Sequence, residues 1–270
     1  IRIYSKVDIT IWQQVFQTLR ERHPLLRSTF PNLGEQPIQQ IHQHQELDFL
    51  QIDASSWSEE ELNKKVVAAH RYPFNLETEP VMRVRWFTCS EQDHIMLLTI
   101  HHIALDGWSC NLVAKELPQL YQAQLNGIEA SLPPLQYSYQ DYVSWQRELI
   151  EGEEGEQLWN YWQQKLSREL PVLNLPTDRP RPPIQTYNGG SYSFKLSEKL
   201  TEQLKELAQT EGVTLYMILL ATFQVLLYRY TGQVDILVGS PTSGRTKAEF
   251  TSIVGCFVDS MAVSYTHLRA

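Results

Sequence analysis

Two adjacent histidines stand between an apolar run and a turn-forming Asp-Gly pair, and this stretch constrains the fold most. The run Ile95–Ile100 is rich in residues that favour strands, so it predicts a β-strand that ends at the histidines. Because successive strand residues point to opposite faces, we expect one of His101 and His102 to be buried and the other to face a cavity. Asp106 can return to the same turn, and Gly107 allows a close backbone approach or a positive φ. An imidazole held in such a turn can serve in proton transfer near neutral pH.

Five further segments carry recognisable residue patterns. They are RHPLLRSTF (22–30), YPFNLETEPVMR (72–83), YQDYVSW (139–145), LPTDRPRP (175–182) and VGCFVDS (254–260). Together with HHIALDG (101–107), they resemble, in the same order, the motifs of the condensation domains of nonribosomal peptide synthetases, within the chloramphenicol acetyltransferase-like superfamily. The resemblance covers the chain from about residue 7 to about residue 262. The chain departs from it at Pro24, where Glu is usual, and at Asp259-Ser260, where Asn-Thr is usual.

The resemblance implies an α/β fold, a two-lobed, chloramphenicol acetyltransferase-like mixed α/β sandwich that is truncated at both ends. We expect residues 1–170 to form the N-terminal lobe, lacking its first strand and helix. Residues 171–262 then hold the linker and the beginning of the C-terminal lobe. The octapeptide 263–270 breaks the family pattern and resembles the translation of a sequencing adapter, so we expect an artefact there. A natural divergent tail is the alternative.

The resemblance also implies an activity, the formation of a peptide bond between two carrier-bound substrates. The amine of an aminoacyl group attacks the thioester of an upstream acyl or peptidyl group. Both substrates ride on the 4'-phosphopantetheine of partner carrier domains, and the domain itself binds no cofactor. The implied partners are the upstream and downstream peptidyl carrier domains and an adjacent adenylation domain in the same polypeptide, in the cytoplasm. We expect the fragment alone to be inactive.

The histidine motif supplies the site residues that the family implies. His102 is expected to accept the amine proton, or to hydrogen-bond the amine and orient its lone pair. His101 is expected to support it from the opposite strand face. Asp106 is expected to form a structural salt bridge with Arg245 of the second lobe across the reaction tunnel; the alternative is that it orients His102. Gly107 is expected to give the pantetheine arm room beside the backbone.

Other residues of the motifs have both a binding and a structural interpretation. Trp108 and Ser109 can bind substrate in the tunnel, or serve as a core aromatic and a helix N-cap. His42 and His44 share one strand face, but no acidic or cysteine cluster completes a metal site, so we expect no metal.

Several alternative functions stay open. An epimerization domain has the same fold, although Asp106–Ser109 resembles condensation members more closely. A noncatalytic module that docks carriers or other partners is a second alternative, but such relatives usually lose the histidine pair. A free-standing acyltransferase is a third. A heterocyclizing relative would carry Asp in place of the histidines.

Composition narrows the classes of partner. The chain has 270 residues and a formal net charge of −8, which argues against nucleic acid and anionic membranes as partners. Three widely spaced cysteines form no disulfide framework, as suits a reducing cytosol. No apolar run is long enough to span a membrane.

Periodicity and capping residues predict the elements. Expected helices are 9–22 behind Asp8, 56–70 behind a Ser56–Glu59 capping box, 108–126 ended by Gly127, 139–150, 157–166, 197–211, and a buried one at 214–230. Expected strands are a hairpin of 38–41 with 47–52, the pair 81–88 and 95–100, and single strands at 190–196 and 234–239. The acidic run 151–156 is expected to be a loop and the Pro-rich stretch 171–183 a linker.

Overall fold

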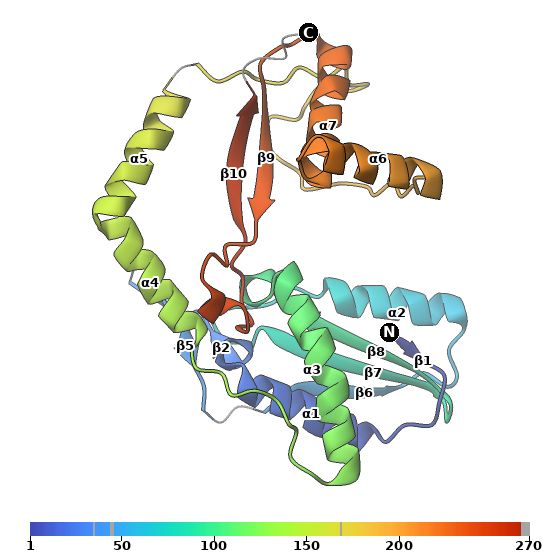
Figure 1. Ribbon diagram of the computed structural model, residues 1–270. Coiled ribbons are helices and arrows are strands. Elements are labelled where there is room, and N and C mark those ends of the chain that lie inside the picture. Colours follow the sequence, from blue (N-terminus) through green and yellow to red (C-terminus); the bar gives the residue numbers. More distant parts are fainter. Residues whose placement is uncertain (35, 44–45, 168, 266–270) are drawn as a thin grey trace. The chain divides into compact units, whose positions relative to one another are not determined.

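The computed structural model describes residues 1–34, 36–43, 46–167 and 169–265. Two compact units are present (Figure 1). The first contains residues 1–158 and 242–259, and the second contains residues 159–241 and the residues from 260 onward. His44 and residues 266–270 lie outside the described residues.

A four-stranded sheet forms the centre of the first unit. Its order is β1 (Arg2–Ile3), β8 (Asp93–Ile100), β7 (Met82–Ser90) and β6 (Asp48–Asp53). β8 runs antiparallel to both of its neighbours, and β6 runs parallel to β7. The predicted pairing of the two strands around residues 81–100 is confirmed.

Helices cover both faces of this sheet (Figure 1). α1 (Ile9–Arg22) and α3 (Gly107–Asn126) lie on one face and α2 (Glu59–Arg71) on the other. The alternation along β7 explains this, because Met82, Val84 and Trp86 enter the core cluster with α1 and α3. Phe87 points the other way and packs in a smaller cluster with Leu62 of α2.

Two predicted helices have the predicted ends because local signals set them. α1 begins behind Asp8, whose carboxylate accepts from the N–H of Thr10, and α3 ends at Gly127 in the left-handed conformation. The prediction for the start of α2 was wrong by two residues, since its N-cap is Ser58 and not Ser56. Ser56 and Ser58 both precede the glutamates, and the N-cap is Ser58, which is nearer to the apolar residues of the helix.

The predicted hairpin within residues 30–52 is wrong. β6 pairs with β7 in the main sheet, in parallel, and not with the strand before it. Short strands and a turn precede it: β2 (Ser28–Thr29) pairs with β5 (Gln40–Ile41), and β3 (Asn32–Leu33) pairs with β4 (Gln36–Pro37). A parallel partner distant in sequence leaves no local turn signal.

The helices after residue 138 continue from the first unit into the second. α4 (Tyr139–Glu151) starts with a capping box of Ser138 and Asp141, and α5 (Glu153–Leu166) follows directly. The acidic run is therefore mostly helical and not a loop. Glu153, Glu154 and Glu156 occupy the first turn of α5, where negative charge interacts favourably with the helix dipole.

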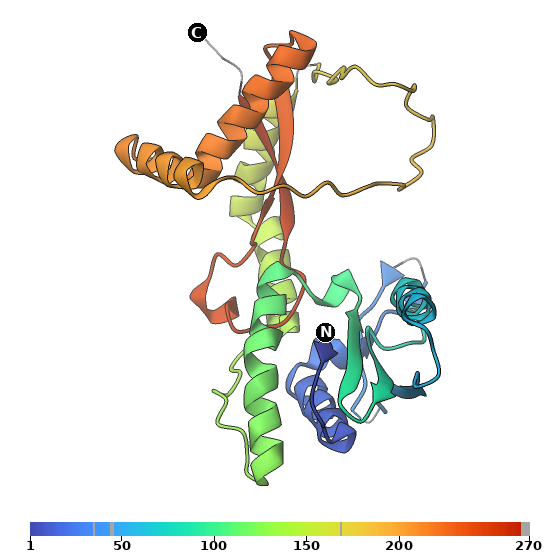
Figure 2. The same ribbon diagram turned by 90° about the vertical axis from the view of Figure 1, so that its right-hand side faces the viewer.

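The second unit holds α6 (Glu198–Thr210), α7 (Leu215–Thr231) and a two-stranded sheet of β9 (Ile236–Thr242) and β10 (Asp259–Tyr265). Residues 169–197 carry no helix or strand (Figure 2). The predicted strand at 190–196 is wrong: Tyr192 and Phe194 are exposed, and no ladder holds that stretch within the described residues. The prediction that α7 is buried is also wrong, since Phe223 and Tyr230 are exposed.

No single described helix is long and apolar enough to cross a membrane. α6 and α7 meet that criterion of length and composition only when they are taken together, and the pair is bent by 106°.

The segment 242–259 returns to the first unit through an aromatic cluster. Tyr142 of α4 packs with Phe250, Ile253 and Phe257. Tyr142 is buried in this cluster, and Arg245 lies in the same compact unit as the histidine motif. The lobe division at residues 170/171 and the origin of residues 263–270 stay predictions; residues 263–265 continue β10.

Candidate functional site

The histidines lie in a short turn between the sheet and α3. β8 ends at Ile100, and the backbone N–H of His101 donates to the carbonyl oxygen of Val81 at 2.8 Å. His102 opens a 3₁₀ turn that ends at Ala104, and Asp106 caps the N-terminus of α3. The predicted strand end at Ile100 and the turn after it are therefore confirmed, but strand alternation does not apply to the two histidines, because both lie beyond the strand. Their side chains diverge because of the turn and not because of strand alternation.

His101 is half-buried and has structural partners. Its Nδ1 accepts a hydrogen bond from the N–H of Ile103 at 3.1 Å, and its ring lies edge-on to Phe74 with 5.7 Å between centroids. Burial lowers the pKa of His101, and the neighbouring His102 adds to this effect, so the neutral ring is favoured. A neutral His101 that caps the turn can hold His102 in place.

His102 is exposed, and its ring touches the segment 254–258. The Nδ1 atom lies 3.6 Å from Sγ of Cys256. This contact leaves Nε2 as the ring nitrogen that an incoming substrate can approach.

The carboxylate of Asp106 is fully buried and accepts three hydrogen bonds. Its donors are Arg245 Nη1 at 2.5 Å, the N–H of Ser109 at 2.7 Å and the N–H of Phe257 at 3.1 Å. Burial alone would raise the pKa of Asp106, but these hydrogen bonds outweigh it and hold the pKa below its usual value. His102 is not among the hydrogen-bond partners of this carboxylate in the described part of the chain.

Arg245 is held on several sides. Its Nη2 donates to Ser109 Oγ at 2.8 Å and to the carbonyl oxygen of Ile253 at 3.2 Å, and its guanidinium lies 3.9 Å from the centroid of the Phe257 ring. Only 1% of its side chain is exposed. Because both partners belong to the first unit, the ion pair stabilises that unit from within.

The residues directly after Asp106 have different environments. Gly107 is the first residue of α3 and lacks a positive φ, so that part of the prediction was wrong. A Cβ at Gly107 would meet no protein atom within 4 Å, so the chain's own packing does not require glycine there. Trp108 is 47% exposed and donates through Nε1 to the carbonyl oxygen of Thr251 at 2.8 Å.

Ser109 does not fit the predicted substrate contact. It is fully buried, its hydroxyl donates to the carbonyl oxygen of Gly255 at 2.8 Å, and it accepts from the N–H of Gly255 at 3.0 Å. With the bond from Arg245, its hydrogen-bonding capacity is used. Nor is it the N-cap, because Asp106 holds that position. Ser109 joins α3 to the segment 254–258.

Sequence reasoning missed the side of the site formed by Cys256 and its neighbours. Tyr139 donates to the carbonyl oxygen of Cys256 at 2.6 Å, and a Cβ on Gly255 would lie 2.3 Å from the Tyr139 ring. Glycine is therefore required at 255 for this close approach. The signal was available in VGCFVDS, one of the motifs, but no spacing linked it to the histidines.

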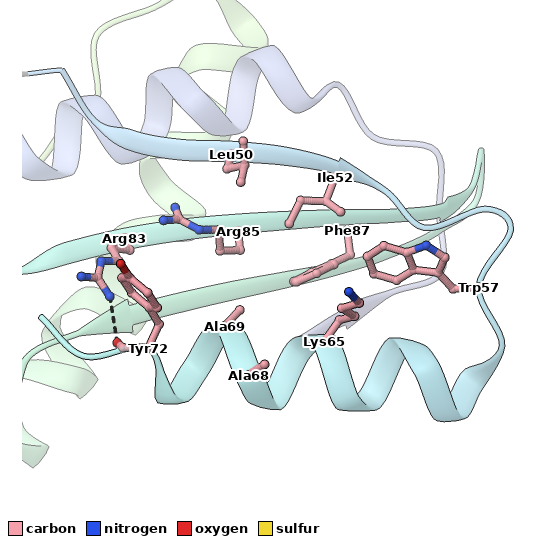
Figure 3. A pocket seen from close by; sticks show the side chains of 10 residues that line it. All are labelled: Leu50, Ile52, Trp57, Lys65, Ala68, Ala69, Tyr72, Arg83, Arg85 and Phe87. Atoms are coloured by element: carbon pink, nitrogen blue, oxygen red, sulfur yellow. Dashed lines mark hydrogen bonds between the residues drawn. The ribbon is translucent and has the colours of Figure 1, made fainter.

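His102 does not line either of two pockets in the first unit. A pocket of about 390 Å³ between α2 and the sheet has an apolar floor of Leu50, Ile52 and Phe87, with Lys65 and Arg85 at its rim (Figure 3). None of the predicted site residues lines it. Another pocket, of about 480 Å³, lies between β8 and α3 and includes Leu105 of the histidine turn.

No group of three or more His, Cys, Asp or Glu side chains that could hold a metal ion occurs within residues 1–34, 36–43, 46–167 and 169–265. The absence of a metal role stays a prediction.

Comparisons with known proteins agree in one family. A family model described as "Condensation domain" matches residues 1–269. Gramicidin S synthase 2 of Brevibacillus brevis is 38% identical over 264 residues, which cover 98% of this chain and 6% of that protein. Tyrocidine synthase 3 of Brevibacillus parabrevis is 36% identical over 263 residues, which cover 97% of this chain and 4% of that protein.

Solved structures of low sequence identity share the fold. The complex of the X-domain and OxyB from teicoplanin biosynthesis matches with a TM-score of 0.86 at 24% identity, over 97% of this chain and 58% of that chain. The epimerization domain from the third module of tyrocidine synthetase B matches with a TM-score of 0.84 at 20% identity, over 97% and 60%. The predicted α/β fold class is thereby confirmed. The chain spans about three fifths of these solved chains and a small part of the two synthases.

Proposed function

Because the chain belongs to the condensation domain family of nonribosomal peptide synthetases, we propose that it forms a peptide bond between two carrier-bound substrates. The observation that carries the proposal is the exposed imidazole of His102 in the turn that leads to Asp106, whose carboxylate forms a buried pair with Arg245. Exposure leaves the ring open to a substrate, and the buried pair fixes the turn that bears it.

The reaction requires the protein mainly to position the two substrates and to accept the proton that the amine loses. The acceptor amine attacks the donor thioester carbonyl, a C–N bond forms, the C–S bond breaks, and the thiol of the donor arm leaves. The amine loses one proton, and His102 is placed to accept it or to orient the nitrogen lone pair by a hydrogen bond. Holding two tethered substrates end to end removes much of the entropy of a bimolecular encounter.

The other residues of the motif have supporting roles in this proposal. Asp106 and Arg245 act through structure, since the hydrogen bonds of the carboxylate go to the guanidinium and to two backbone N–H groups. Gly107 leaves space beside the backbone for a pantetheine arm, and exposed Trp108 offers that arm an apolar surface. His101 keeps the turn in shape.

The partners follow from the same chemistry. In the full-length protein we expect an upstream and a downstream peptidyl carrier domain, whose 4'-phosphopantetheine arms carry the substrates, and an adjacent adenylation domain, all in the cytoplasm. The domain needs no bound cofactor of its own, because the thioester is already activated. The chain of 270 residues is expected to be inactive by itself.

The test is His102→Ala in the full-length protein. Single-turnover formation of dipeptide from two loaded carrier domains should fall by about 100-fold or more, as expected for loss of a proton-transfer group. The melting temperature should stay near wild type, because His102 is exposed. Near-normal dipeptide yield from folded variant protein would refute the role of His102. A product with inverted configuration and no new peptide bond would identify an epimerase instead.

A further inference from the structure

The ring of His102 has one hydrogen-bond partner in the part of the chain that the structure describes. That partner is Cys256, whose Sγ lies 3.6 Å from Nδ1. The distance is within the range for sulfur, whose larger radius lengthens its hydrogen bonds, although a thiol is a weak donor and acceptor. An exposed imidazole without support would sample several rotamers. The sulfur therefore bears directly on which way the ring points.

The position of Cys256 is itself fixed by hydrogen bonds on both sides. Its carbonyl oxygen accepts a hydrogen bond from Tyr139. On one side, Gly255 donates its N–H to the hydroxyl of Ser109 and accepts from that hydroxyl through its carbonyl oxygen. On the other side, Phe257 donates its N–H to the carboxylate of Asp106. The sulfur is thus attached to a stretch of backbone that cannot shift without breaking buried bonds. A hydrogen-bond partner can fix the ring of His102 only if its own position is fixed, and Cys256 meets this condition.

The chemical state of the sulfur suits a positioning role. Burial raises the pKa of the Cys256 thiol, so the thiol stays protonated near neutral pH. A protonated, half-buried thiol is a poor nucleophile, which argues against attack of Cys256 on the thioester. Its sulfur can accept a hydrogen bond from Nδ1–H of the neighbouring ring, which leaves the lone pair of Nε2 free for the amine.

We propose that Cys256 is a positioning residue, which holds the His102 ring through Nδ1 so that Nε2 faces the reacting amine. The contact sets the rotamer of the ring and the nitrogen that meets the substrate. This inference rests on the proposed function of His102. It assigns a role to a side chain that the histidine motif does not contain.

The experiment compares Cys256→Ala with Cys256→Ser in the full-length protein. Alanine removes the hydrogen bond, and the single-turnover rate of dipeptide formation should fall roughly tenfold, less than the ~100-fold that a 1 Å misplacement can cost. Serine restores a donor and acceptor and should recover most of the rate. The concentration of acceptor carrier that gives half the maximal rate should be unchanged, because the carrier does not touch Cys256 in this proposal. Cys110→Ser is the matched control, since Cys110 is exposed and is not among the hydrogen-bond partners of His102 within the described residues.

Each outcome decides the matter. A rate within twofold of wild type for Cys256→Ala, or a serine variant as slow as the alanine one, would overturn the proposal. Where the alanine variant fails to fold, the isosteric pair Cys256→Thr and Cys256→Val gives the same comparison, with the hydroxyl-bearing variant expected to be faster. If His102→Ala retains activity, then the proposed function of His102 fails, and this result is distinct from failure of the cysteine contact.

Discussion

Replacing Asp106 with Asn should destabilise the first unit strongly, although the two side chains have nearly the same shape. The change removes the negative charge opposite Arg245, whose side chain is 1% exposed. Breaking a buried ion pair by removing one partner costs about 3–5 kcal/mol, because the other charge stays buried. At about 2–4 °C per kcal/mol for a unit of this size, the melting temperature should fall by roughly 6–20 °C. Asn still caps a helix, so the loss reports the charge and not the cap.

The matched control is Asp8→Asn. Asp8 also caps a helix through its carboxylate, at the start of α1, but it is exposed and forms no buried ion pair within the described residues. Its variant should melt close to wild type. The difference between the two variants then isolates burial of the charge.

The pH dependence follows from the lowered pKa of Asp106. Because the folded-state pKa lies below that of the unfolded chain, the contribution of the carboxylate is complete above about pH 4. It is lost as the pH falls through the folded-state value. Urea unfolding at several pH values should therefore show the gap between wild type and Asp106→Asn closing in acid.

A double-mutant cycle with Arg245→Met tests the reasoning itself. If the two side chains stabilise each other, the double variant should lose less stability than the sum of the single losses. Additivity within about 0.5 kcal/mol would refute the interaction. A stable but inactive Asp106→Asn protein would instead favour the alternative in which Asp106 orients His102.

Two further predictions concern metal and a second buried acid. Chelation of the full-length protein should leave dipeptide formation unchanged, and elemental analysis should find no stoichiometric metal; a tightly bound zinc whose removal stops turnover would contradict this. Glu116→Gln should cost about 1.5–3 kcal/mol in urea unfolding at neutral pH, because Glu116 accepts from Arg22 at 3.2 Å and contacts His23 Nε2 at 2.8 Å. Burial raises the pKa of Glu116, but its contacts with His23 and Arg22 lower the pKa by more, so the folded-state pKa lies below that of the unfolded chain. The loss should therefore be complete above about pH 4.3 and should disappear as the pH falls through the folded-state value. The exposed Glu21→Gln is the control, and an equal loss there would mean that burial is not the cause.

Local signals in the sequence were enough to predict the elements that carry the histidine turn. The strand-forming residues of β7 and β8, the N-cap at Asp8 and the glycine after α3 are signals that each lie within a few residues. The strand β6 was predicted, but its pairing was wrong, because its partner is 35 positions away in register, with Asp48 opposite Arg83. Periodicity predicts that a segment forms a strand, but it does not identify the strand with which that segment pairs.

The exposure of α7 was mispredicted for a different reason. Its composition is apolar on all sides, and such a helix is normally buried. Tyr216, Phe223 and Tyr230 nevertheless face solvent in the second unit. Composition predicts what a helix would gain from burial, but it does not predict whether another element packs against that helix.

The prediction of the site was right for the buried ion pair and missed the neighbouring cysteine. The pairing of Asp106 with Arg245 came from family resemblance, and the two are 139 positions apart, so no spacing rule could have supplied it. No role was predicted for Cys256, although the next residue, Phe257, donates its N–H to the carboxylate of Asp106.

The geometry also explains why an acid four residues after His102 need not belong to a proton relay. A relay requires the carboxylate to reach the imidazole, whereas both oxygens of Asp106 are engaged by a guanidinium and two backbone N–H groups. Those three donors come from α3 and from the segment 245–257, which also carries Cys256. The carboxylate therefore joins the element that follows His102 to the segment that supports its ring. Removing Asp106 would disturb His102 from both sides at once, through the start of α3 and through the sulfur, so loss of activity alone cannot distinguish relay from scaffold. Stability and the arginine cycle can, because only a scaffold requires the two buried charges to be coupled.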